Sequence, residues 1–462
     1  MLDYIRIHGL RGFQTAQQLN LAKPTGTPGS GLTVVLGANN SGKTTIIEAF
    51  RAIRMAEPPS FSQGRRNLPA GDRVEIVASC DGGIATLRSL RRGQSETERE
   101  TTGDLITLRR LLVLPSRRFF DPYFSKATWS RVDYAQHAGG LPSSRSTNLH
   151  ELTHRLFAVN RDRGGFDELF SKLVSPLPNW TIDQTDQGTY FLKFQDARGT
   201  HSSEGLGEGL VSLLYIVDAL YDSKDGDLII IDEPELSLHP ALQRRLANII
   251  FEYAASRQIV IATHSPYLID LRALESGMAI ARAHLREDGV RVSQLSVETA
   301  GHLYGLLRDK NNPHLLGLNA REIFFVDDRV VLVEGQEDVV FYDVVLTELN
   351  LQLGGDFFGW GVGGAGNMAH LAAVLAELGY SKVVGILDAD KAELVGELRR
   401  RFPDYRFFAQ PANDVRTKTE RPGRAAVEGL LNEKNEAIRR EHLESIRTLF
   451  TDVNQYLADA PR

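Results

Sequence analysis

The stretch "LTVVLGANNSGKTTIIEAF", residues 32–50, joins an aliphatic run to an amphipathic run through a loop of glycines and small polar residues. The first run predicts a buried strand, and the apolar positions of the second fall on one face of a helix. Residues 37–44 between them match the phosphate-loop pattern in full. Glycines let backbone N–H groups close around phosphates, and the start of the helix adds the positive end of its dipole. The stretch therefore predicts a nucleotide site in an α/β fold.

The residues of this loop have distinct predicted roles. Lys43 would bridge the terminal phosphates of ATP, and the Thr44 hydroxyl would bind Mg²⁺. The other candidate nucleotide contacts are Gly37, Asn40, Gly42 and Thr45. A glycine-rich turn that only caps a helix is the alternative, but the order of strand, loop and helix favours the nucleotide site.

A second stretch, "LIIIDEPELSLHP" (residues 228–240), supplies acids for the same site. Four aliphatic residues predict a buried strand that leaves Asp232 and Glu233 at its carboxyl end. We expect Asp232 to hold the Mg²⁺ shell and Glu233 to polarise the attacking water. "IVIATHSP" (residues 259–266) is a third strand of this kind, and it places His264 at the same sheet edge, within reach of the γ-phosphate.

Composition restricts the class of protein. The chain has 462 residues, of which 42% are apolar and 24% charged, as expected of two or three globular domains. A single cysteine, Cys80, excludes an internal disulfide framework and a multi-cysteine zinc site, and it suits a reducing cytoplasm. We expect neither a transmembrane helix nor a signal peptide. The net charge of −6 argues against a uniformly basic surface, although it leaves room for a local basic groove.

The order of predicted elements indicates two α/β domains. We predict an ATPase domain over residues 1–290, with an inserted helical lobe at about 120–180, where Pro, Ser, Gly and Arg are frequent. We predict that residues 291–325 form a connecting region between the two domains. A second alternation of strands and helices begins with "RVVLVEG" and predicts a smaller α/β domain over residues 326–462.

The first domain resembles the ABC-type P-loop ATPases of DNA repair and defence. The similarity lies in the opening "IRIHGLRGF" and in "DEPELSLHP". In that family two heads enclose ATP, and a signature loop of one head completes the site of the other. The matching loop here begins a helix at Gly207, Glu208 and Gly209, which makes Gly207 and Gly209 nucleotide contacts and implies a homo-oligomer, a dimer or larger.

This resemblance leaves some residues open. The family commonly has serine where Gly207 stands, and Ser202 and Ser203 are out of register with it. Arg117 and Arg118 in "LPSRRFF" are possible phosphate or DNA contacts, but a solvated basic loop is the preferred interpretation.

The second domain carries a separate cluster of acids. "LVEGQEDVVF" (residues 332–341) puts Glu334 at the end of a predicted strand and Asp338 in the first turn of the next helix, and "LDAD" puts Asp388 and Asp390 at another strand end. Carboxyl ends of parallel strands share one edge, so the four carboxylates would repel one another unless cations bound between them. Hard oxygen ligands of this kind suit Mg²⁺, Mn²⁺ or another divalent cation.

The spacing of these two motifs closely resembles a Toprim domain, and an ABC-type head followed by a Toprim domain resembles the OLD (overcoming lysogenization defect) nuclease family. The resemblance implies metal-dependent nicking or cleavage of DNA, in anti-phage defence or DNA maintenance, and a second defence-system protein is a further possible partner. It assigns catalysis and metal binding to Glu334, Asp388 and Asp390, with Glu428 as the further acid. It also calls for a basic residue, for which Lys391, Lys418 and Lys434 compete.

Other functions remain to be weighed. Topoisomerases, primases and recombination mediators also carry Toprim domains. A type II topoisomerase would need a strand-passing scaffold and a tyrosine-bearing winged helix, and the sequence suggests neither. Primases and recombination mediators usually carry a zinc module, which a single cysteine cannot make. The alternative from another class is a DNA-sensing ATP switch whose Toprim domain binds a partner or nucleic acid without cutting.

Overall fold

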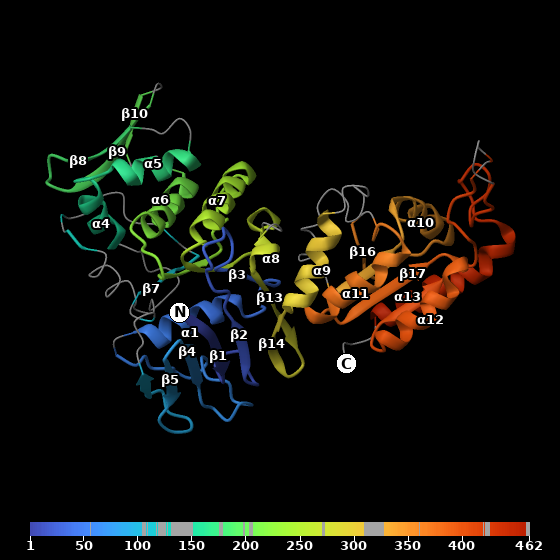
Figure 1. Cartoon of the computed structure of the whole chain (residues 1–462), viewed down its shortest axis with the longest axis horizontal. Coiled ribbons are helices and arrows are strands. Elements are labelled where there is room, and N and C mark those ends of the chain that lie inside the picture. The colour runs from blue at the N-terminus through green and yellow to red at the C-terminus, as the bar shows by residue number, and fades with distance from the viewer. Residues whose placement is uncertain are drawn as a thin grey trace. The chain divides into compact units, whose positions relative to one another are not determined.

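The computed structural model describes residues 1–55, 57–103, 108, 110–116, 118, 126, 128–130, 151–174, 179–196, 199–202, 207–269, 273–308, 328–359, 361–418, 420 and 426–458. These residues form two compact units, Met1–Gln294 and Leu295–Arg462 (Figure 1). Each unit has its own sheets and its own core, so each is described by itself.

Unit 1 is built on a six-stranded sheet with the order β14-β13-β3-β12-β11-β7. All neighbours pair in parallel except β13 and β14, which are antiparallel. A parallel sheet is covered on both faces, which explains why its central strands are continuous aliphatic runs. The strands are β3 (Leu32–Leu36), β7 (Leu111–Leu114), β11 (Leu228–Asp232), β12 (Gln258–Ala262), β13 (Ala279–Arg286) and β14 (Gly289–Gln294).

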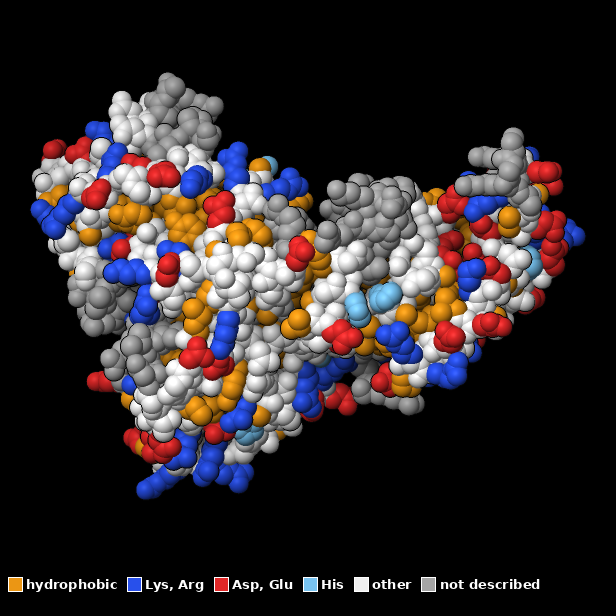
Figure 2. Space-filling view, viewed as in Figure 1, with side chains coloured by type: hydrophobic (Ala, Val, Ile, Leu, Met, Phe, Trp, Pro, Cys, Tyr) orange, Lys and Arg blue, Asp and Glu red, His pale blue; other side chains and the backbone are white. Residues whose placement is uncertain are grey.

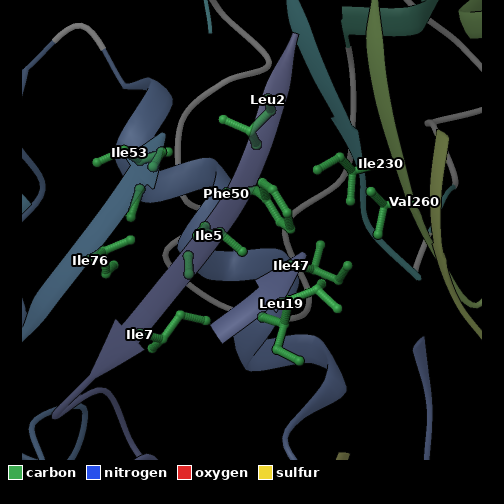
Figure 3. Packing of buried hydrophobic residues seen from close by; sticks show 14 of the residues in the cluster. Leu2, Ile5, Ile7, Leu19, Ile47, Phe50, Ile53, Ile76, Ile230 and Val260 are labelled. Carbon is green, nitrogen blue, oxygen red and sulfur yellow. The ribbon is translucent and has the colours of Figure 1, made fainter. Parts of the chain in front are cut away.

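A second sheet of unit 1 is antiparallel, with the order β2-β1-β4-β5-β6. Helix α1 (Lys43–Arg54) packs between the two sheets and contacts β1, β4 and β5 on one side and β7, β11 and β12 on the other. Figure 3 shows Phe50 and Ile47 of α1 among side chains of both sheets, including Ile5, Ile230 and Val260. The strands are β1 (Leu2–His8), β2 (Gln17–Asn20), β4 (Glu75–Cys80), β5 (Gly83–Ser89) and β6 (Thr97–Gly103).

The predicted insert differs from the structure in extent and composition. Much of residues 120–180 lies outside the described residues, but a three-stranded antiparallel sheet, β8-β9-β10, follows the two described helices and continues to Ser202. The lobe is therefore not only helical: Trp180 of β8 is buried against Phe166 of α5 and is paired with Phe194 of β9. The elements are α4 (Glu151–Val159), α5 (Gly164–Leu173), β8 (Asn179–Gln184), β9 (Tyr190–Asp196) and β10 (Gly199–Ser202).

Two further long helices complete unit 1. Helix α6 (Glu208–Tyr221) contacts α5 and β7, and α7 (Pro240–Tyr253) connects β11 to β12. This β11–α7–β12 unit is the strand–helix–strand order that the sequence predicts. The 3₁₀ turn η2 (Pro266–Leu268) and the short helix α8 (Ala273–Ser276) follow β12.

Unit 2 is a four-stranded parallel sheet with helices on both faces. Val331, Val333, Val384 and Ile386 form one core with α10 and α13. The side chains between them in sequence point to the opposite face, where α11 contacts β17 and α12 contacts β18. The elements are β15 (Arg329–Val333), β16 (Asp356–Phe357), β17 (Lys382–Leu387), β18 (Arg406–Ala409), α9 (Val297–Arg308), α10 (Gln336–Leu349), α11 (Met368–Glu377), α12 (Ala392–Arg401) and α13 (Leu443–Ala458).

The predicted connecting region at 291–325 contains regular structure. Its first residues complete β14, and α9 then packs against α11 of unit 2. The Glu377 carboxylate accepts hydrogen bonds from the backbone N–H and the hydroxyl of Ser296, just before α9. This capping contact attaches α9 to unit 2, so the division falls at Gln294 rather than at 290.

Two surface properties bear on partners. Over most of the face seen in Figure 2, acidic and basic side chains are interspersed. Within the described residues, no helix combines the length and apolar character needed to cross a bilayer.

A pair of glycines tests the packing of unit 2. In Gly385→Ala, the new Cβ on β17 would lie 2.4 Å from Phe407 Cδ1, so we expect a loss of about 1–3 kcal/mol of unfolding free energy from overpacking. No heavy atom within the described residues lies within 4 Å of a Cβ at Gly396 of α12. Gly396→Ala should therefore stabilise the unit by about 0.5–1 kcal/mol through helix propensity. Urea unfolding of both variants measures the difference, and equal effects would contradict this packing.

Candidate functional sites

The phosphate-loop motif between β3 and α1 has a backbone conformation that its glycines make possible. Gly42 immediately precedes α1 with φ 102°, and Gly37 has φ 149°. A Cβ at Gly37 would lie 2.2 Å from the carbonyl oxygen of Ala283, so no larger residue fits there. Asn40 also has positive φ, at 64°, a conformation that asparagine tolerates better than most residues.

Lys43 is folded into this loop. Its ammonium donates to the carbonyl oxygens of Gly37 (2.9 Å) and Ala38 (3.0 Å), and the residue is only 5% exposed. Burial lowers the pKa of Lys43, while the nearby carboxylates of Glu233, Asp232 and Glu235 oppose that shift. Thr45 is buried in the first turn of α1.

Asp232 ends β11 beside this loop. Burial first, and the charge of Glu233 second, raise the pKa of Asp232 to about 7, although a hydrogen bond from the Thr44 side chain favours the charged form. The residue is 1% exposed, and no described residue donates a hydrogen bond to its Oδ1. A buried carboxylate oxygen without a donor, next to a threonine hydroxyl, fits the ligand set of a nucleotide-bound Mg²⁺.

Glu233 and His264 lie together, because β11 and β12 are paired in parallel. His264 Nε2 is 3.9 Å from Glu233 Oε1. Burial and the charge of Lys43 lower the pKa of His264 below 6.5, which keeps the imidazole neutral at pH 7. Glu235, which the sequence reading passed over, accepts the backbone N–H of His264 at 2.6 Å and so fixes the start of that loop.

The helix that begins after the signature-like loop packs against the turn that follows Glu233. Gly207 precedes α6 in extended conformation, and a Cβ at Gly209 would lie 2.4 Å from the carbonyl oxygen of Ser237. Gly209 is therefore required for this close approach within the chain. Ser203 lies outside the described residues.

The preferred interpretation of Arg118 as part of a solvated basic loop is wrong. The side chain is buried, and it donates hydrogen bonds to Ser212 Oγ and to the backbone carbonyls of Pro115, Asp232 and Glu233. Burial lowers the pKa of Arg118 to about 10, so the guanidinium stays charged at neutral pH. Arg117 lies outside the described residues.

In unit 2, the ends of β15 and β17 bring the first pair of predicted acids together. Glu334 Oε1 accepts the backbone N–H of Asp388 at 2.9 Å, across fifty-four positions of sequence. Asp338 Oδ2 accepts the backbone N–H of Gly335 at 2.8 Å and caps the start of α10. Both oxygens thus hold the backbone around the cluster in a fixed arrangement.

Burial makes this cluster electrostatically unfavourable. It raises the pKa of Asp388 to about 7 and that of Asp338 to about 6, and the charge of Glu334 adds to both shifts. Burial also raises the pKa of Glu334. Asp390 is more exposed, and its carboxylate lies 2.5 Å from the ammonium of Lys391.

Two members of the cluster come from a segment that the sequence reading did not consider. Gln410 donates to Asp388 Oδ1, and the charge of Asp414 raises the pKa of Glu334, Asp338 and Asp388. Both residues follow β18, the neighbour of β17 in the parallel sheet. The same edge rule that identified Glu334 and Asp388 would have found them.

The remaining predicted residues of unit 2 lie apart from this cluster or beside it. Glu428 has an 82% exposed side chain that pairs with Arg439 at 3.3 Å. Lys418 pairs with Asp414 and lies 3.0 Å from Glu337, whereas only a backbone contact to Asn432 is described for Lys434. In this conformation, no group of three or more His, Cys, Asp or Glu side chains among the described residues is arranged around a single ion position.

Comparison with known proteins agrees with the first site. A family model described as "AAA domain" matches residues 4–119, and one described as "AAA domain, putative AbiEii toxin, Type IV TA system" matches residues 105–270. Residues of unit 1 are therefore similar to AAA domains over two overlapping ranges. The chain is 31% identical to Endonuclease GajA of Bacillus cereus (strain VD045) over 181 residues, which is 37% of this chain and 27% of GajA. The match thus spans about a quarter of that relative's length.

Solved SMC head domains are also similar. The Thermotoga maritima head is 16% identical with a TM-score of 0.37, over 64% of this chain and 99% of that one. A Pyrococcus furiosus head bound to the C-terminal domain of ScpA is 12% identical with a TM-score of 0.43, over 67% of this chain and 99% of that one. Because likeness of this degree is weak, the α/β fold is argued from the strand order described above.

The electrostatics of unit 2 predict a pH-dependent stability. Because its pKa in the folded chain is raised, Asp388 favours folding only while protonated: its contribution is complete below about pH 4 and is lost as pH rises through about 7. In EDTA, Asp388→Asn should therefore melt at a higher temperature than wild type at pH 8 and at the same temperature at pH 4.

Thermal unfolding at the two pH values measures this difference, and Asp343→Asn on the exposed face of α10 is the matched control. A lower melting temperature for Asp388→Asn at pH 8 would mean that the carboxylate is not buried as described.

Proposed function

We propose that the chain binds and hydrolyses ATP at the phosphate loop of unit 1 and cleaves DNA phosphodiester bonds at the acid cluster of unit 2. The observation that carries the second half is the contact of Glu334 with Asp388, with Asp338 and Asp414 electrostatically coupled to both. Buried carboxylates without a stable counter-charge indicate a site for divalent cations.

For ATP hydrolysis, each residue of unit 1 has a role that its contacts support. Lys43 and the loop backbone bind the phosphates, and Thr44 with Asp232 would hold Mg²⁺, which neutralises phosphate charge when bound. Glu233 would accept a proton from the attacking water, and neutral His264 beside it would orient that water.

For DNA cleavage, Glu334, Asp338, Asp388 and Asp414 would hold Mg²⁺ or Mn²⁺, with Asp390 beside them. A bound ion of this kind supplies Lewis-acid stabilisation of the phosphodiester oxygens. The Toprim-like motif spacing supports this metal site, and the partial similarity of the chain to Endonuclease GajA supports an endonuclease activity. Lys391, which pairs with Asp390 at 2.5 Å, would lie beside a bound phosphate.

The proposal includes partners and setting. DNA is the substrate, and the signature-like loop at Gly207 and Gly209 supports a homodimer or larger assembly in which each copy completes the nucleotide site of another. The OLD-like motif order supports a cytoplasmic role in anti-phage defence, alone or with a second defence protein.

A DNA-sensing ATP switch is the second candidate. The observation that favours it is that oxygens of Glu334, Asp338, Asp388 and Asp414 are already engaged by donors of the chain itself, without an ion position common to three of them. Such a protein would bind DNA and hydrolyse ATP without nicking it in any divalent metal.

Substitutions at the phosphate loop test the first activity. Lys43→Ala should abolish tight ATP binding, whereas Glu233→Gln should keep binding and lower kcat by about 10²–10⁴-fold through loss of a general base. Fluorescent-nucleotide titration and phosphate release measure the two effects. Wild-type turnover in Glu233→Gln would show that another group polarises the water.

Substitutions at the acid cluster test the second activity. Glu334→Ala, Asp388→Ala and Asp390→Ala should each remove nicking of supercoiled DNA in Mg²⁺ or Mn²⁺, and Asp338→Ala should weaken it. ATP hydrolysis measured on the same samples should persist, because the two sites belong to different sheets. Asp343→Ala is the control, and EDTA gives the metal-free baseline. Undiminished nicking in Asp388→Ala would contradict the assignment of the cluster.

A further inference from the structure

Arg118 lies just beyond β7 and joins three segments of unit 1. Its Nε donates to Ser212 Oγ of α6 at 2.8 Å, and Nη1 donates to the carbonyl oxygens of Pro115 and Asp232, both at 2.7 Å. Nη2 donates to the carbonyl oxygen of Glu233 at 2.8 Å. The residue is only 4% exposed, so these partners, rather than water, satisfy the guanidinium.

The peptide groups of Glu233 are held on both sides. Its φ is 46°, a left-handed conformation that residues with a Cβ rarely adopt. The backbone N–H donates to the carbonyl oxygen of Ala262 at 2.8 Å, and the carbonyl oxygen accepts from the Leu236 N–H as well as from Arg118. A strained conformation persists only where several contacts determine it, and the direction of the Glu233 carboxylate depends on it.

The other end of the Arg118 network is the first part of α6. Ser212 is buried one turn after Glu208, and the Glu208 carboxylate accepts a hydrogen bond from Ser237 Oγ at 3.0 Å. The close approach of Gly209 to the Ser237 carbonyl oxygen joins the same helix turn to the same loop. A displacement of α6 would therefore reach Glu233 through Ser212 and Arg118.

We propose that Arg118 is a positioning residue for ATP hydrolysis: it holds the Glu233 peptide so that the carboxylate faces the attacking water, and it couples that position to α6. This rests on the proposed ATPase activity. Arginine is required because its planar fork reaches the Asp232 and Glu233 carbonyls and Ser212 together, which a lysine ammonium cannot do.

A double-mutant cycle tests this assignment. The variants are Arg118→Lys, Glu233→Gln and the double variant, compared by kcat and KM in steady state and by single-turnover hydrolysis where kcat is low. Arg118→Lys should lower kcat about ten- to a hundredfold, as a misplaced catalytic group does, with KM within about twofold of wild type. In the Glu233→Gln background the same change should lower the rate by less than about twofold, because the group it positions is already gone.

Arg66→Lys is the matched control for loss of a buried arginine. Arg66 pairs with Asp72 at 2.9 Å and donates to the carbonyl oxygens of Phe61 and Gly93, none of which belongs to α6 or to the Glu233 turn. It should lower the melting temperature and leave kcat unchanged. Ser212→Ala, a milder change that removes only the α6 contact of Arg118, should lower kcat about three- to tenfold, the size expected for the loss of one hydrogen bond of ordinary net strength.

The outcomes separate the possibilities. The proposal is overturned if Arg118→Lys lowers the hydrolysis rate by the same factor in the wild-type and Glu233→Gln backgrounds. It is also overturned if Arg118→Lys leaves kcat unchanged in the wild-type background. If Arg118→Lys does not fold, wild-type kcat in Ser212→Ala overturns the coupling to α6. Absence of ATP hydrolysis by the wild-type chain would instead contradict the proposed function itself.

Discussion

Buried carboxylates at the carboxyl edge of a parallel sheet cost free energy, and in both units other groups of the chain partly offset that cost. In unit 1 the Asp232 carboxylate is almost fully buried. The positive charges of Arg118 and Lys43 favour its ionised form and so partly oppose the rise in its pKa. In unit 2 a backbone N–H and a lysine compensate each of the Glu334 and Asp338 carboxylates, and the Gln410 side chain compensates Asp388. In unit 2 the remaining cost is the physical basis for the proposed cation site.

The cations near the buried carboxylates differ between the two sheet edges. Lys43 and Arg118 are themselves buried and donate hydrogen bonds to backbone carbonyl oxygens. Lys391 and Lys418, in contrast, have partly exposed side chains: Lys391 pairs with Asp390, and Lys418 pairs with both Asp414 and Glu337.

Much of this could be predicted from the sequence because it depends on short-range patterns. The aliphatic run before Gly37 and the amphipathic run after it are β3 and α1, and the edge rule brought Glu334 and Asp388 together. The same edge rule applies to β18, whose short run precedes Gln410 and Asp414. Glu428, which the family resemblance suggests as the further acid of the cluster, has an exposed side chain. Burial of Arg118 could not be predicted, since its partners are backbone carbonyls distant in sequence.

The central claim is that the acid cluster of unit 2 binds divalent metal, and Mn²⁺ binding to the nucleotide-free chain at pH 8 tests it most directly. Electron paramagnetic resonance counts the free Mn²⁺ at each point of a titration. The account predicts saturable binding that Asp388→Asn and Glu334→Gln remove and that Asp343→Asn leaves intact, because ligands must be deprotonated carboxylates. Absence of saturable binding, or binding that persists in both cluster variants, would contradict it.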